Sequence, residues 1–302
     1  MFDLVLSIAL LLFMPPLLLG VINKTKAWVG GRVGAPVLQP YHDIIKLLRK
    51  DMVLSRTTTW IFPLGPVVTL AALLLAGLLM PLGAFAAPLR FSGDLILFAY
   101  LLGLARFFTT AAALDTGSSF EGMGAAREVT FACLTEPALF FALLVLTRIS
   151  GSLSLNDMLH APAANLSAVV AAPLVLVALG VFVVLLAENC RIPVDDPTTH
   201  LELTMIHEVM VLDHSGPLLG AVLYSAALKL FILGALFLHL AAPFQTGSPG
   251  LDWGLFVAEM LALAVGVGVV ESVRARLPMP HVPYLLLASL VSCGFGFLLL
   301  VR

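Results

Sequence analysis

The sequence predicts an all-α integral membrane protein with eight transmembrane helices and both termini on the outer side of the membrane. Of its 302 residues, 60% are hydrophobic and only 11% are charged, with a mean hydropathy of +1.06. A soluble domain carries about 25% charged residues. Eight apolar segments approach the roughly 20 residues that cross a bilayer, and the loops between them alternate in charge. We therefore expect a single membrane domain over residues 1–302.

The eight predicted segments leave few residues outside the bilayer. They are Leu4–Ile22, Trp60–Leu82, Asp94–Ala113, Val129–Thr147, Ala168–Ala187, Pro217–Ala241, Asp252–Glu271 and Val282–Val301. The cytoplasmic loops then cover about residues 23–59, 114–128, 188–216 and 272–281.

The orientation follows from the basic residues. The odd-numbered loops hold eleven of them, namely Lys24, Lys26, Arg32, Lys46, Arg49, Lys50, Arg56, Arg127, Arg191, Arg274 and Arg276. The opposite side holds only Arg90, Arg148 and Arg302. Because basic loops stay in the cytoplasm, the odd-numbered loops are predicted to be cytoplasmic.

A short amphipathic helix is predicted in the first cytoplasmic loop, over Gln39–Lys50. Four apolar residues form one stripe with basic residues at its margins. They are Ile44, Ile45, Leu47 and Leu48, flanked by Lys46, Arg49 and Lys50. This pattern fits an anchor on anionic lipid and equally a docking surface for a soluble partner.

The stretch Glu188–Glu208 concentrates titratable groups in an otherwise apolar chain. With Asp213 just beyond, they are Glu188, Asp195, Asp196, His200, Glu202, His207 and Glu208. Asp196-Pro197 and the capping pattern after Thr199 predict a helix that runs to about Leu212. On such a helix His200 and His207 share a face, as do Glu202 and Asp213.

Five ionisable residues fall well inside the predicted membrane segments: Arg106, Glu136, Lys229, Glu259 and, near the outer end of its segment, His239. A charge at that depth costs a few kcal/mol unless it is paired, hydrated or neutral. These residues therefore indicate either structural ion pairs or a hydrated proton path. Glu128 lies eight residues before Glu136, about 80° around a helix, so the two face roughly the same sector.

Metal binding and hydrolytic catalysis are disfavoured. His207-Glu208 begins like a zinc-protease motif, but Val211 stands where the second histidine belongs. Cys133, Cys190 and Cys293 show no ligand spacing. No nucleophile elbow is present, and nothing in the composition indicates a nucleic-acid partner.

Three polar stretches resemble the cytoplasmic loops of subunit 1 (also called H) of respiratory complex I. They are GRVGAPVLQPYHDIIKLLRKD (Gly31–Asp51), GAAREVTFACLTEPAL (Gly124–Leu139) and ENCRIPVDDPTTHLEL from Glu188. The continuation PVDDPTTHLELTMIHE is similar to the hydrogenase branch of that family. These are the membrane subunits of group 4 nickel–iron hydrogenases, including formate hydrogenlyase subunit 4, hydrogenase-4 and energy-converting hydrogenases.

The sequence departs from the quinone-reducing relatives at several positions. Thr198 and His200 stand where those relatives usually carry glutamates, and Lys229 lies near another such position. Compared with those relatives, three residues are also added between Glu202 and Asp213. These departures place quinone binding in doubt and favour the hydrogenase branch.

The resemblance implies a coupling subunit without a redox centre of its own, in a bacterial or archaeal cytoplasmic membrane. Its partners would be the hydrogenase large and small subunits and iron–sulfur subunits, which hold the nickel–iron centre and clusters, and antiporter-like membrane subunits. The ion-coupling candidates are Glu136, Glu188, Asp195, Glu202, Glu208, Asp213, Lys229 and Glu259. The docking and structural candidates are Arg32, Gln39, Pro40, Asp43, Lys46, Arg127, Glu128, Arg191, Pro193, Asp196, Pro197, His200 and His207.

Three other functions remain as alternatives. The chain could be the quinone-chamber subunit of a complex I-like oxidoreductase that uses NADH or ferredoxin. It could also be a stand-alone ion transporter, or a membrane anchor without any part in coupling. Each alternative makes a different prediction for the buried acids.

Overall fold

The computed structural model describes residues 2–164, 168–196, 205–242 and 246–301, which fold into helices with no β-strand among them. The helices are α1 (Phe2–Val29), α2 (Gln39–Leu48), α3 (Ile61–Leu79), α4 (Asp94–Asp115), α5 (Ser119–Ser150), α6 (Leu155–Ala164), α7 (Ala168–Glu188), α8 (Gly216–Ala241), α9 (Pro249–Val273) and α10 (Val282–Val301). Two short 3₁₀ turns, η1 (Glu208–Val211) and η2 (Met279–His281), precede α8 and α10.

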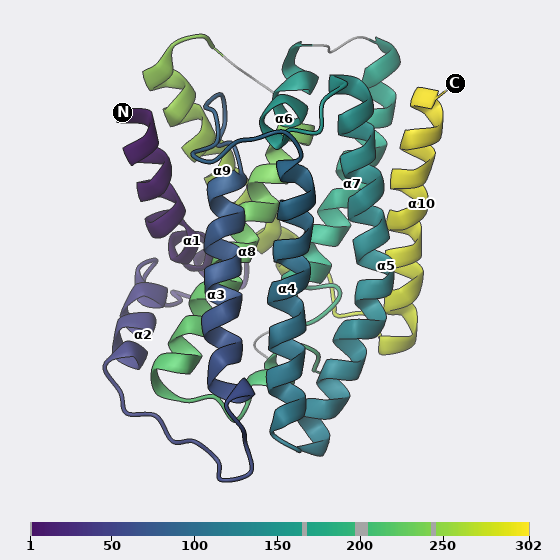
Figure 1. Cartoon of the computed structure of the whole chain (residues 1–302). Coiled ribbons are helices and arrows are strands. Elements are labelled where there is room, and N and C mark those ends of the chain that lie inside the picture. The colour runs from purple at the N-terminus through teal and green to yellow at the C-terminus, as the bar shows by residue number, and fades with distance from the viewer. Residues whose placement is uncertain (1, 165–167, 197–204, 243–245, 302) are drawn as a thin grey trace.

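Eight of these helices are long and apolar enough to cross a membrane, as predicted: α1, α3, α4, α5, α7, α8, α9 and α10. They form one elongated bundle, with both ends of the chain at the same end of it and α2 towards the other (Figure 1). The end that carries α2 is the end predicted to be cytoplasmic, and we refer to it as the inner end.

Two helices extend well beyond the predicted segments. α1 continues past Ile22 to Val29, and α5 begins at Ser119 rather than Val129. The predicted loop of residues 114–128 is therefore mostly helical. Arg127 and Glu128 lie on α5, and this placement brings Glu128 into the bundle.

A helix also forms within the predicted stretch of the first loop. α2 begins at Gln39 with Pro40 in its first turn, where a missing N–H costs nothing, and none of its residues is buried. Gln39 Nε2 donates to Asp43 Oδ1 one turn later at 2.8 Å. The position of α2 on the cytoplasmic membrane surface remains a prediction.

α8 is the most deeply buried of the eight spanning helices, and it packs against α1, α3 and α7. Close approach of the helices depends on small residues, as is usual in membranes. A Cβ added to Gly180 on α7 would lie 2.4 Å from the Cys293 sulfur on α10. A Cβ added to Gly268 on α9 would lie 2.8 Å from Cβ of Thr25 on α1.

The predicted helix running to Leu212 is wrong for the part that the structure describes. Residues 205–207 are not helical, and only the short η1 turn follows. Carboxylates take the backbone N–H groups that an α-helix would use internally: Asp195 accepts from Ile206 at 3.0 Å, and Glu121 accepts from Asp213 at 3.1 Å. His200 and Glu202, which were expected on this helix, lie outside the described residues.

Candidate functional site

Arg106, from the middle of α4, holds together the carboxylates of three neighbouring residues. Its Nη2 donates to both oxygens of Glu188, at the end of α7, at 2.5 and 2.6 Å. Its Nη1 pairs with Glu136, and its Nε lies 3.5 Å from Glu128 Oε1, both on α5. The prediction that Glu128 and Glu136 face the same sector is confirmed by this shared partner.

Glu188 is the most heavily bonded member of this group. Besides Arg106, it receives Lys229 Nζ from α8 at 2.7 Å and the Thr135 hydroxyl from α5 at 2.6 Å. Its side chain is only 8% exposed. A carboxylate buried this deeply must have charge partners and hydrogen-bond donors to remain ionised, and Glu188 has both.

We call Arg106, Glu128, Glu136, Glu188 and Lys229 the charge cluster. With every group ionised, three carboxylates face two cations, so the cluster has one acid more than it can neutralise. Glu136 is the exposed end of the cluster, with 47% of its side chain accessible, whereas Arg106 is 11% exposed. A cluster with an excess acid can bind a proton without losing all of its ion pairs.

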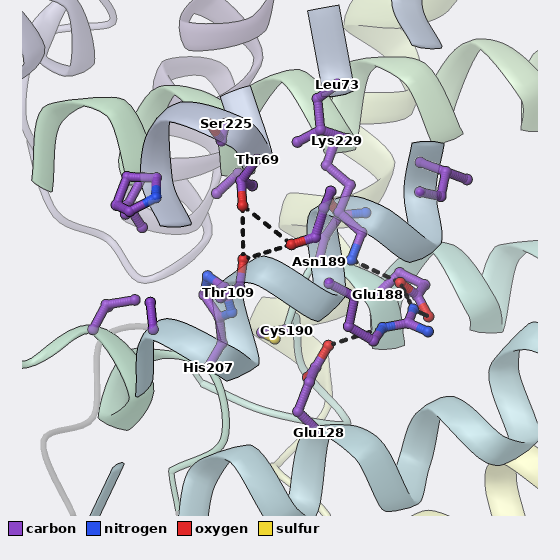
Figure 2. Close-up of a pocket in the computed structure, with 18 of the residues that line it drawn as sticks. Thr69, Leu73, Thr109, Glu128, Glu188, Asn189, Cys190, His207, Ser225 and Lys229 are labelled. Atoms are coloured by element: carbon purple, nitrogen blue, oxygen red, sulfur yellow. Dashed lines mark hydrogen bonds and ion pairs between the residues drawn. The ribbon is translucent and has the colours of Figure 1, made fainter. Parts of the chain in front are cut away.

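A cavity of about 70 Å³ adjoins the charge cluster (Figure 2). Helices α3, α4, α5, α7 and α8 line it together with the segment that contains η1. Its polar wall consists of Thr69, Arg106, Thr109, Glu128, Glu188, Asn189, Cys190, His207, His214, Ser225 and Lys229. One water needs about 10–15 Å³ of such volume and two to four polar partners, so the cavity has room and donors for several waters.

Five polar atoms in the cavity wall are buried without a hydrogen-bond partner among the described residues: Arg106 Nε, Asn189 Oδ1, both ring nitrogens of His214 and the Ser225 hydroxyl. Buried polar atoms are normally satisfied by protein or by ordered water. Waters in the cavity would supply partners for these atoms. A second cavity of about 10 Å³ lies beside Glu128, Thr135 and Glu188.

The inner wall of the cavity holds groups that stay neutral near neutral pH. Burial lowers the pKa of His207, and burial also lowers the pKa of His214 to about 4. Burial raises the pKa of the Cys190 thiol well above its ordinary value, and Glu128 contributes to that rise. The charges around the cavity therefore come from Arg106, Lys229 and the carboxylates.

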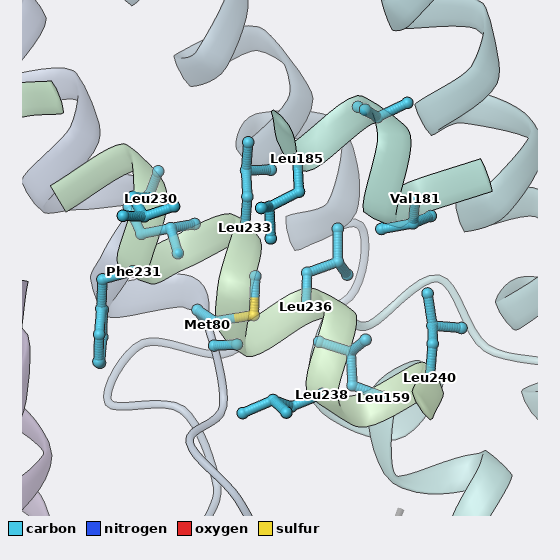
Figure 3. Packing of buried hydrophobic residues seen from close by; sticks show 14 of the residues in the cluster. Met80, Leu159, Val181, Leu185, Leu230, Phe231, Leu233, Leu236, Leu238 and Leu240 are labelled. Carbon is cyan, nitrogen blue, oxygen red and sulfur yellow. The ribbon is translucent and has the colours of Figure 1, made fainter. Parts of the chain in front are cut away.

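Towards the outer end of the bundle, the charge cluster is followed by closely packed apolar side chains (Figure 3). From α8 these include Leu233 and Leu236, which meet Met80 after α3 and Leu185 on α7. All four are at most 1% exposed. None of these four side chains lines the cavity.

The remaining acids of the fifth loop have structural surroundings. Asp195 accepts from Arg276 at 2.8 Å as well as from Ile206, so it ties the loop to the segment before α10. Arg191 lies 3.3 Å from Glu271 on α9, and Lys26 on α1 lies 2.9 Å from the same carboxylate.

Of the eight ion-coupling candidates, the structure brings Glu136, Glu188 and Lys229 together. Asp195 instead pairs with Arg276, and Asp213 is exposed. Glu208 and Glu259 line neither cavity. Glu202 lies outside the described residues.

The docking candidates divide in a similar way. Arg127 donates to the Met205 carbonyl at 2.7 Å, and Glu128 and His207 line the main cavity. Arg191, Pro193 and Asp196 belong to the loop held by Asp195 and Glu271, whereas Arg32, Gln39, Pro40, Asp43 and Lys46 lie in or before α2. Pro197 and His200 lie outside the described residues.

Arg106, the centre of the cluster, is an intramembrane charge in the sequence but is not among the predicted coupling or docking residues. The signal was present, because Arg106 is the only arginine inside a predicted apolar segment. Thr135, Asn189 and Ser225 were missed because such side chains are common in apolar helices. Only the fold shows that they converge.

Comparisons with known proteins show the family of the chain. A family model described as NADH dehydrogenase matches residues 2–302. Formate hydrogenlyase subunit 4 of Escherichia coli K12 is 32% identical over 300 residues, covering 96% of this chain and 94% of its own length. Hydrogenase-4 component C of the same organism is 34% identical over 235 residues, covering 78% and 73%.

More distant relatives belong to other respiratory complexes. The H subunit of NADH-quinone oxidoreductase from Polaromonas naphthalenivorans is 28% identical over 150 residues, which is 49% of this chain and 42% of that one. A chain of the membrane-bound sulfane sulfur reductase, an archaeal respiratory membrane complex, has the same fold, with a TM-score of 0.84, 23% identity and coverage of 99% and 98%. The chain therefore belongs to the NADH dehydrogenase family of membrane subunits, which includes subunits of formate hydrogenlyase, hydrogenase-4 and NADH-quinone oxidoreductase.

Proposed function

We propose that this protein is the anchoring and coupling subunit of a membrane-bound hydrogenase in a bacterial or archaeal cytoplasmic membrane. Its inner-end loops dock the nickel–iron and iron–sulfur subunits, and its charge cluster links their electron transfer to the movement of protons or sodium ions. The observation that carries this proposal is the charge cluster, which is buried except at Glu136 and has one excess acid, beside a cavity of about 70 Å³.

Coupling requires a group that can exchange protons and also sense a change in the partner subunits. Glu128 and His207 line the cavity from the inner end, next to loops that we expect to face the partners. Glu188 and Lys229 lie deeper, so a change at the inner wall reaches the ion pairs through Arg106. A shift of charge near the inner wall would alter which acid of the cluster holds the proton.

Electron transfer is assigned to the partner subunits. Among the described residues, no group of three or more His, Cys, Asp or Glu side chains is placed to hold a metal ion. In this proposal the role of the charge cluster is electrostatic, and the partners supply the redox change.

Quinone reduction is the second candidate function, and the apolar part of the cavity wall favours it. Pro66, Leu73 and Leu102 form that part of the wall. Small-molecule pockets usually measure roughly 300–1,000 Å³, several times the 70 Å³ of this cavity. The small volume supports water rather than a quinone head group as the occupant.

The experiment uses the intact complex, with Glu128→Gln, Glu136→Gln and Lys229→Ala made separately. We expect assembly to persist and ion movement per electron transferred to fall in each variant. Glu121→Gln is the matched control, because Glu121 is another buried acid on α5 that lines neither cavity. It should leave the ion-to-electron ratio unchanged.

The alternatives predict other outcomes. A pure anchor would keep the wild-type ratio in all three variants. A stand-alone transporter would move ions as the purified chain in liposomes. Hydrogen-linked activity that depends on quinone would support the complex I-like function instead.

A further inference from the structure

Glu259 is an ionisable side chain in the middle of α9 that the charge cluster does not use. It is partly exposed, and it makes no hydrogen bond or ion pair with any described residue. No residue of α9 lines either cavity. An ionised carboxylate facing hydrocarbon costs a few kcal/mol, so such residues normally have a polar or charged partner.

The surface beside Glu259 is shaped for a close helix contact. Gly254, Ala258, Ala262 and Gly266 follow one another at four-residue intervals, and all four are exposed. A Cβ added to Gly254 or Gly266 would meet nothing within 4 Å in this chain. Residues four apart share one side of a helix, so the four form a continuous strip of small side chains.

Glu259 borders this strip. It lies three residues before Ala262 and seven before Gly266, which places it along the same edge of α9. We call Gly254, Ala258, Glu259, Ala262 and Gly266 the α9 face. Its small side chains leave room for the backbone of another helix to approach closely, and it carries one carboxylate in the middle of α9.

The same helix already uses small residues for close packing on its other side. Gly268 lets α1 approach so closely that an added Cβ would lie 3.1 Å from the Ile22 carbonyl oxygen. Gly268 therefore marks a helix contact inside this chain. The α9 face has the same composition but no helix of this chain against it at Gly254 or Gly266.

We propose that the α9 face binds a transmembrane helix of another membrane subunit, and that this helix places a basic side chain opposite Glu259. Charge complementarity decides between the possible occupants. A second copy of this chain, paired through its own α9 face, would bring two Glu259 carboxylates together, and lipid offers no cation at this depth. The inference requires only that the chain is a subunit of a membrane complex and does not depend on ion coupling.

The first test replaces Ala262 with a photo-crosslinking amino acid in the native complex. Ala288, an exposed alanine in α10, is the matched control position because α10 has no acidic or basic residue. We expect position 262 to crosslink to one other integral membrane subunit, at a helix that carries Lys, Arg or His near the crosslink. We expect no crosslink to that helix from position 288.

The second test measures how firmly the other subunit stays bound to this chain in detergent. Ala262→Leu should reduce recovery of the crosslinked subunit in mild detergent about threefold or more, whereas Ala288→Leu should not. An unchanged level of the variant in the membrane shows that it has folded. Crosslinks only to lipid, only to another copy of this chain, or to a helix without a basic residue would overturn the proposal. Because crosslinking needs no turnover, failure of the coupling function would leave this result unchanged.

Discussion

Arg106 forms ion pairs with three carboxylates at once, more than any other described side chain. Its planar group donates to both oxygens of Glu188 and still reaches Glu136 and Glu128. Lysine presents a single compact charge and cannot reproduce this geometry.

Replacing Arg106 should therefore destabilise the fold strongly. Arg106→Gln leaves Glu188 with Lys229 as its one cation, and breaking a buried pair in this way costs about 3 kcal/mol or more. Arg106→Lys should cost less, since the charge is kept. Thermal unfolding in detergent measures both, and Arg90→Gln, at an exposed outer arginine, is the control with no expected change. Equal midpoints for Arg106→Gln and Arg90→Gln would contradict a central role for Arg106.

His214 makes stability depend on pH. Its ring stacks on Phe62, with centroids 4.1 Å apart, and burial lowers its pKa to about 4. Because the pKa in the unfolded chain is about 6.5, the unfolded state binds the proton first as the pH falls. The stabilisation from neutral His214 is complete above about pH 6.5 and is lost towards pH 4, by up to about 3 kcal/mol.

His214→Phe keeps an aromatic ring on Phe62 and removes this titration. As the pH is lowered from 7 to 4.5, wild type should lose more stability than the variant, so the difference between them should shift in favour of the variant. The difference between the two unfolding midpoints, measured in detergent across this range, checks the prediction. A constant difference at every pH would show that His214 does not titrate as proposed.

At the scale of elements, α1 is held to α8 at a point where its own hydrogen bonding is interrupted. Pro16 has no N–H, so the carbonyl of Leu12 lacks its usual donor four residues on. The Tyr224 hydroxyl of α8 donates to that carbonyl at 2.8 Å. A neighbouring side chain commonly satisfies a carbonyl freed by proline in this way.

Tyr224→Phe should therefore lower stability by about 0.5–1 kcal/mol, the net value of one hydrogen bond. Faster hydrogen exchange in the N-terminal half of α1 should accompany the loss. Tyr100→Phe is the control, since Tyr100 is 74% exposed and donates no hydrogen bond to a described residue. An equal loss in both variants would mean that the hydroxyl of Tyr224 does not support α1.

The boundaries of the helices show what could be predicted from the sequence and what could not. Apolar length alone placed all eight spanning helices, because a bilayer demands about 20 apolar residues. The start of α5 was missed, since Arg127 and Glu128 interrupt the apolar run. Their partners come from distant elements, Met205 for Arg127 and Arg106 for Glu128, so hydropathy could not show that they are helical.

The candidate site was only partly predictable for the same reason. Glu136, Glu188 and Lys229 are conspicuous as charges in apolar surroundings, and the structure brings them together. Glu259 has the same appearance in the sequence but lines neither cavity. Which intramembrane charges meet depends on how helices pack side by side, and a single sequence carries no record of that.

At the scale of the whole molecule, the distribution of basic residues predicts which end of the bundle faces the cytoplasm. Eleven of the sixteen Lys and Arg residues belong to the odd-numbered loops, at the end of the bundle that carries α2. The charge cluster lies towards this end, because Glu188 ends α7 there. The proposed function requires this end to face the soluble partners.

Cysteine labelling tests this orientation directly. In a chain whose three native cysteines are replaced, Ser55→Cys lies in the exposed α2–α3 loop and Ser248→Cys lies just before α9. In sealed right-side-out vesicles, a membrane-impermeant maleimide should label position 248 and spare position 55. Permeabilised vesicles should label both positions, which controls for accessibility. The reverse pattern would place the charge cluster near the outer face and would contradict docking of cytoplasmic partners at the inner end.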